Sequence, residues 1–84
     1  MKPYHKLDLT TRNRIIGLIN QCEISNLGNV SFDYYSMPKI EAKSFRMSKN
    51  NLGWELVVIA KDSLTRDIYK VLDGQITHDY SEKD

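Results

Sequence analysis

Two histidines, His5 and His78, are the imidazoles with which this chain could perform acid–base chemistry. His78 precedes Asp79, and a histidine near a carboxylate can act as a general base when a nucleophile and a pocket are also present. No serine or cysteine lies in the sequence context typical of an activated nucleophile. We therefore interpret His78 as a half-buried residue of a sheet, and we assign no catalytic residue.

Metal and phosphate chemistry also lack their usual residues. The acids of the second part of the chain are spread over predicted turns and a tail, and their spacing does not match a calcium loop. Cys22 is the single cysteine, which excludes an intrachain disulfide and a multi-cysteine zinc site. The four glycines stand singly, so they form no Gly-rich loop for a nucleotide phosphate. These absences predict a protein that is not an enzyme and that holds no metal and no cofactor.

Nucleic-acid binding is indicated by residues 34–49, where aromatic and basic side chains are interleaved. Lysine and arginine can follow a phosphate backbone while bases stack on tyrosine. The candidate contacts, which include two arginines from the preceding helix, are Arg12, Arg14, Tyr34, Tyr35, Lys39, Lys43, Arg46 and Lys49. The alternative is that these cations form a solvated or edge-protecting face of a strand.

Charge is divided unevenly along the chain, although the net charge is only +1. Residues 1–49 hold eight Lys and Arg and four acids, whereas residues 50–84 hold four Lys and Arg and seven acids. The two parts therefore carry +4 and −3. Such asymmetry favours an anionic partner for the first part or association of the chain with itself.

The length of 84 residues predicts a single domain, 1–84, with a small core. The longest uncharged apolar run, residues 56–60, is far shorter than the roughly 20 residues that cross a bilayer. The positive N-terminus is not followed by an apolar stretch, so the sequence predicts no secretory signal and no membrane partner. We expect a cytoplasmic protein.

A helix over residues 10–23 is predicted by the spacing of its apolar side chains, after a loosely held arm at residues 1–8. The apolar stripe consists of Ile15, Leu18, Ile19 and Cys22. Asp8 or Thr10 can cap the N-terminus, and residues 26–29 supply the positive-φ positions that commonly end a helix. We expect Cys22 to be a buried small apolar residue rather than a nucleophile.

Alternating strand residues around Asp73-Gly74 predict a β-hairpin that pairs Val71 with Ile76 and Tyr69 with His78. A second hairpin is predicted from residues 43–48 and 53–61, joined by a loop at residues 49–52. In that register Met47 faces Trp54, Arg46 faces Glu55 and Phe45 faces Leu56. The next strand then places Tyr69 beside Val58 and Val71 beside Leu56.

These elements predict an α+β fold with one N-terminal helix packed on an antiparallel β-meander of three to five strands, at residues 43–80, before a tail at 81–84. Residues 30–35 are a further short strand or an extended loop. An alternative for residues 63–73 is a helix whose apolar stripe consists of Leu64, Ile68, Val71 and Leu72. In outline, Gly53-Trp54 and the hairpin around Asp73-Gly74 resemble the helix-plus-meander of PepSY-type domains, and we infer no function from this resemblance.

Strand alternation predicts a second apolar face on the sheet, opposite the face that the helix can cover. It collects Val57, Ile59, Ile68 and Leu72. Apolar residues on an uncovered sheet face usually mark an interface, unless residues 24–36 fold across them. We therefore expect a small non-catalytic accessory or regulatory protein, such as an inhibitor, that binds another protein or itself as a homodimer. Nucleic-acid binding through the basic segment is the alternative.

Overall fold

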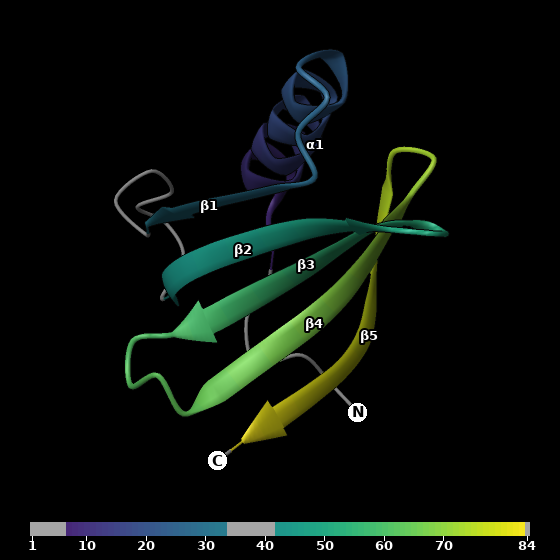
Figure 1. Ribbon diagram of the computed structural model, residues 1–84. Coiled ribbons are helices and arrows are strands. Elements are labelled where there is room, and N and C mark those ends of the chain that lie inside the picture. Colours follow the sequence, from purple (N-terminus) through teal and green to yellow (C-terminus); the bar gives the residue numbers. More distant parts are fainter. Residues whose placement is uncertain (1–6, 34–41, 84) are drawn as a thin grey trace.

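The computed structural model describes residues 7–33 and 42–83, which form one helix and one five-stranded antiparallel sheet. The sheet order follows the chain order (Figure 1). The elements are α1 (Leu9–Ile24), β1 (Asn29–Asp33), β2 (Ala42–Asn50), β3 (Gly53–Ala60), β4 (Thr65–Leu72) and β5 (Gln75–Lys83). The predicted α+β fold, a helix followed by a β-meander, is confirmed.

Helix α1 is closed at both ends by the residues that the sequence indicates. Asp8 accepts a hydrogen bond from the backbone N–H of Thr11 at 2.8 Å, which satisfies one of the free donors of the first turn. After the helix, Asn26 takes a positive φ of 57°, and the Leu27 N–H donates to the Cys22 carbonyl at 2.8 Å. Leu7 is buried, so residues 7 and 8 are not part of a loose arm.

The β4–β5 hairpin has the predicted register, with Val71 opposite Ile76 and Tyr69 opposite His78. Asp73 and Gly74 both have positive φ, as a two-residue turn with the right-handed strand twist requires. The alternative helix over residues 63–73 is therefore wrong. The predicted tail is also wrong in part, because residues 81–83 continue β5.

The β2–β3 hairpin has a different register from the predicted one. Asn50 pairs with Gly53 around a two-residue turn, so Met47 lies opposite Leu56 instead of Trp54. The Asn50 side-chain oxygen accepts from the backbone N–H groups of Leu52 and Gly53, both at 2.9 Å, which closes the shorter turn. The shift of two residues leaves every side chain on its predicted face.

The β3–β4 register also differs from the prediction by two residues. Tyr69 lies opposite Leu56 and Val71 opposite Trp54, whereas Val58 lies opposite Asp67. On the first edge of the sheet, β1 begins at Asn29, which confirms a strand in the predicted 30–35 region as far as Asp33. Residues 34 and 35 lie outside the described ranges.

The core lies between α1 and the sheet face that we call the inner face. Ile15, Ile19 and Cys22 of α1 pack there, so the expectation of a buried cysteine is confirmed. The sheet contributes Phe45, Met47, Trp54, Leu56, Val58, Tyr69, Val71 and Ile76. Gly17 is not needed for a close contact, because a Cβ there would meet no atom within 4 Å.

Candidate functional site

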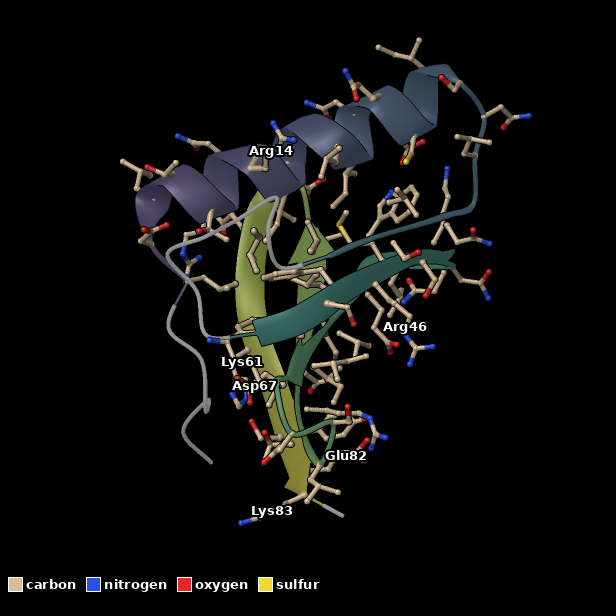
Figure 2. The ribbon with its side chains drawn as sticks, turned by 90° about the vertical axis from the view of Figure 1, so that its left-hand side faces the viewer. Arg14, Arg46, Lys61, Asp67, Glu82 and Lys83 are labelled. Carbon is tan, nitrogen blue, oxygen red and sulfur yellow. The ribbon has the colours of Figure 1, made fainter. Side chains whose placement is uncertain are left out.

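The opposite side of the sheet, which we call the outer face, carries three of the four predicted interface residues as neighbours. Val57 lies opposite Ile68, and Tyr80 follows Ile68 in the same cross-strand row. Ile59 is two residues from Val57 on β3 and therefore shares its face. Figure 2 shows Arg46 and Glu82 on this side, away from the helix, and Asp67 on the other. The outer face is thus an apolar centre surrounded by charges.

Exposure varies along this apolar centre. Val57 and Ile59 are half-buried and Tyr80 is 47% exposed, whereas Ile68 is 3% exposed. Ile68 sits in the row between Val57 and Tyr80, which shield it on both sides. Leu72 is 54% exposed but stands at the end of β4, beyond Lys70, and lines a groove at the hairpin tips. The prediction that Leu72 lies together with Val57, Ile59 and Ile68 is therefore wrong, because Leu72 is at the strand end and lines the groove beside α1.

The alternative that residues 24–36 cross the outer face is wrong for the part that the structure describes. Residues 29–33 form an edge strand beside β2, and Val30 packs against the inner core. Ile24 and Leu27 are exposed, so neither side chain packs on the outer face. Residues 34–36 lie outside the described ranges.

Charges frame the apolar centre in two different ways. On the β4–β5 side they are paired across strands, Arg66 with Glu82 at 3.6 Å and Lys70 with Asp79 at 3.8 Å. On the β2–β3 side, Arg46 and Glu55 form no ion pair within the described part of the chain. Arg46 lies directly opposite Val57, and Glu55 precedes Val57 by two residues on β3. Arg46 and Glu55 therefore both flank Val57, and neither forms an ion pair with a described residue.

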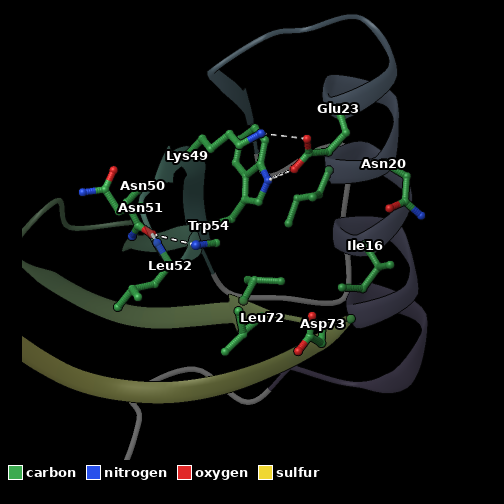
Figure 3. Close-up of a pocket in the computed structure, with 14 residues that line it drawn as sticks. Ile16, Asn20, Glu23, Lys49, Asn50, Asn51, Leu52, Trp54, Leu72 and Asp73 are labelled. Carbon is green, nitrogen blue, oxygen red and sulfur yellow. Dashed lines mark hydrogen bonds and ion pairs between the residues drawn. The ribbon is translucent and has the colours of Figure 1, made fainter.

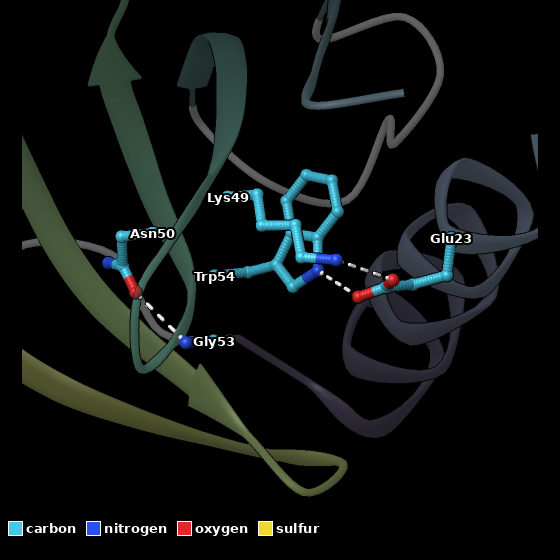
Figure 4. A network of polar contacts seen from close by, with 5 residues as sticks. All are labelled: Glu23, Lys49, Asn50, Gly53 and Trp54. Atoms are coloured by element: carbon cyan, nitrogen blue, oxygen red, sulfur yellow. Dashed lines mark hydrogen bonds and ion pairs between the residues drawn. The ribbon is translucent and has the colours of Figure 1, made fainter. Parts of the chain in front are cut away.

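A groove of about 390 Å³ lies between α1 and the tips of the two hairpins (Figure 3). On one wall of the groove, the Glu23 carboxylate accepts from Trp54 Nε1 and from Lys49 Nζ, each at 2.8 Å (Figure 4). The bonds from Lys49 and then from Trp54 lower the pKa of Glu23. Because these groups satisfy one another, they join the helix end to the sheet rather than offering free groups to a ligand.

Arg12 plays a similar joining role at the other end of α1. Its guanidinium donates to the carbonyl oxygens of Leu7, at 3.1 Å, and of Ile76, at 3.0 Å. Ile76 belongs to the edge strand β5, so the second bond ties the helix to the sheet edge and occupies one of its carbonyls.

A buried hydrogen-bonded chain runs from His78 through Ser81 to Asp67 on the inner face. Ser81 Oγ donates to Asp67 Oδ1 at 2.5 Å, and His78 Nε2 lies 2.8 Å from Ser81 Oγ. Because the serine proton points to Asp67, we infer that Nε2 is the protonated nitrogen and donates. An imidazole in that state cannot accept the serine proton, so this is not an activated nucleophile. The chain instead satisfies Asp67, which is fully buried.

Tyr69 borders this chain and packs edge-on against His78, with ring centroids 5.4 Å apart. Burial, and then the charge of Asp67, raise the pKa of Tyr69 to about 12, against a smaller opposing effect of Arg12. The contact between Ser81 and Asp67 could not be predicted from strand alternation, because an irregularity in the β4–β5 pairing, between Ile68 and Tyr69, turns Ser81 inward. The expected position of His78, half-buried opposite Tyr69, is confirmed.

The predicted nucleic-acid contacts are not gathered on one surface within the described residues. Arg46 is on the outer face, Lys49 bonds to Glu23 at the groove, and Arg14 is exposed on α1 (Figure 2). Lys43 belongs to β2. Tyr34, Tyr35 and Lys39 lie outside the described ranges.

Comparison of the chain with models of known protein families, with curated proteins and with solved structures finds no match. The described part of the chain includes no helix that is long and apolar enough to cross a membrane. It also brings together no group of three or more His, Cys, Asp or Glu side chains that could hold a metal ion.

Proposed function

We propose that the protein is a non-catalytic binding protein, an accessory or regulatory factor that docks a protein chain on the outer face of its sheet. The observation that supports this most directly is the apolar row of Val57, Ile68 and Tyr80 on the face away from α1. An antiparallel sheet can leave one face in water, but that face is then normally polar along its middle strands. Tyr80, which is 47% exposed, and the partly exposed Val57 and Ile59 gain free energy when a partner covers them, whereas Ile68 is already buried.

The other surfaces support this role less well. In the groove, Glu23, Lys49 and Trp54 are bonded to one another, and in the histidine–serine–aspartate chain Ser81 donates its proton to Asp67 rather than to His78. The described cations point to different sides of the molecule, so they do not form a continuous track for a phosphate backbone.

The proposed function is tested with two variants that add the same charge at different places. Ile59→Lys places a cation in the apolar centre, whereas Gln21→Lys places one on an exposed position of α1. Parent and both variants are immobilised and exposed to a lysate of the native host. We expect a protein that the parent and Gln21→Lys retain and that Ile59→Lys loses. The same retained proteins on all three would contradict docking through the outer face.

A further inference from the structure

The outer face carries one cation, Arg46, and one anion, Glu55, and neither forms an ion pair with a described residue. Because the two charges have opposite signs, the face is electrostatically complementary to a second copy of itself. Arg46 is one strand away from Val57, and Glu55 is two residues away along β3. These separations are about 5 Å and about 7 Å, in directions at right angles to each other. A two-fold axis can lie in the plane of the face, pass through Val57 and bisect these two directions. Rotation about this axis places Arg46 of a second copy near Glu55 of the first copy, and Glu55 of the second copy near Arg46 of the first.

We propose that the occupant of the outer face is a second copy of this chain, related by such a two-fold axis, and this inference rests on the proposed function. Val57 then meets its own counterpart at the axis, and Arg46 meets the partner subunit's Glu55. The same contact occurs twice, as an isologous interface requires. The strands of the two sheets cross at nearly a right angle, which is one of the two packing modes of facing sheets.

The size of the face agrees with a weak dimer. Four strands of about eight residues have a footprint about 19 Å wide and about 26 Å long, or on the order of 500 Å². Because the two footprints cross at nearly a right angle, they overlap over about 19 Å by about 19 Å, so two copies bury about 700 Å², which is the size of a weak, transient contact. Tyr80 at 47% exposure adds an aromatic side chain of the kind enriched at such contacts.

Charge reversal provides a test that separates pairing between copies from pairing within one copy. Arg46→Glu alone and Glu55→Arg alone each bring like charges together across the axis, so we expect each to raise the dimer dissociation constant by about tenfold or more. A mixture of the two variants restores both opposite-charge contacts, and we expect it to form a heterodimer close to the parent in affinity. If Arg46 and Glu55 instead paired within one chain, mixing the two variants would not restore the lost pair.

The measurement is sedimentation equilibrium of the parent, each variant and their equimolar mixture, up to a concentration of several hundred micromolar. Arg14→Glu is the control for Arg46→Glu, because it makes the same change in net charge at an exposed position of the helix and should leave the dimer unchanged. Thermal melts of each variant are recorded alongside to establish that it is folded. A parent that remains monomeric, or a mixture no more associated than its components, overturns the second copy as occupant. Retention of a different protein that Ile59→Lys loses would then still support the proposed function.

Discussion

On the inner face of the sheet, buried polar side chains bond to one another, whereas on the outer face charges surround a small apolar centre. Asp67 is satisfied by Ser81, and Trp54 donates to Glu23 where α1 meets the sheet. On the outer face, Arg46 and Glu55 have no ion-pair partner among the described residues. The polar groups of the inner face are therefore satisfied by this chain itself, whereas two charges of the outer face are not paired with a described residue.

The largest effect is expected for Trp54→Ala on the inner face. Trp54 is 4% exposed, and its loss removes both a large buried ring and the bond to Glu23. Truncation should lower the free energy of unfolding by about 3–5 kcal/mol, which largely unfolds so small a domain. Leu72→Ala, at an exposed position of β4, is the control and should change stability little. A Trp54→Ala protein that melts within a few degrees of the parent would show that the inner face is not the core.

A smaller loss is expected for Gly53→Ala at the start of β3. A Cβ there would lie 2.5 Å from the Val71 carbonyl oxygen, and the residue has a φ of +151°. The resulting backbone shift should cost about 1–3 kcal/mol, as overpacking does. Gly17→Ala is the matched control on α1, where the added methyl is in open space and should stabilise the helix by up to about 1 kcal/mol. Chemical denaturation measures both, and equal effects of the two substitutions would contradict the close approach at Gly53.

The smallest effect concerns the joint between α1 and the sheet. The pKa of Glu23 is lowered in the folded state by Lys49 and Trp54, so its contribution to stability is present above its ordinary pKa of 4.5. That contribution is lost as the pH falls through the lowered folded value. Glu23→Gln should therefore reduce stability near neutral pH and make the acid side of the stability profile flatter. If Glu23→Gln loses as much stability as the parent when the pH falls, Glu23 is not the source of that pH dependence.

Side-chain faces could be predicted from the sequence because alternation along a strand survives a register error of two residues. The predicted pairing of Met47 with Trp54 was wrong, yet both residues are buried on the inner face. What the sequence did not predict depends on local irregularity. The two-residue turn that Asn50 closes and the irregular pairing beside Ile68 are set by side-chain hydrogen bonds and by tertiary packing, which no periodicity records.

For the candidate site, too, alternation predicted which face each residue lies on but not which residues lie opposite each other. Val57, Ile59 and Ile68 were assigned to one face by alternation, and they lie together on it. The separation of Leu72 from that centre, the shielding of Ile68 and the lack of an ion pair between Arg46 or Glu55 and any described residue all depend on which residues stand opposite each other. A register error of two residues conceals such relations even when every face is correct.

Adding lysine at two adjacent residues of β3 tests most directly whether the inner face is a core and the outer face is a surface that a partner can cover. Val58 points inward and is fully buried, whereas Ile59 points outward and is half-buried. We predict that Val58→Lys unfolds the protein, because a charge then enters an apolar core, and that Ile59→Lys keeps a cooperative melt while association is lost. If Ile59→Lys unfolds the chain as Val58→Lys does, the outer face is a second core and the account is contradicted.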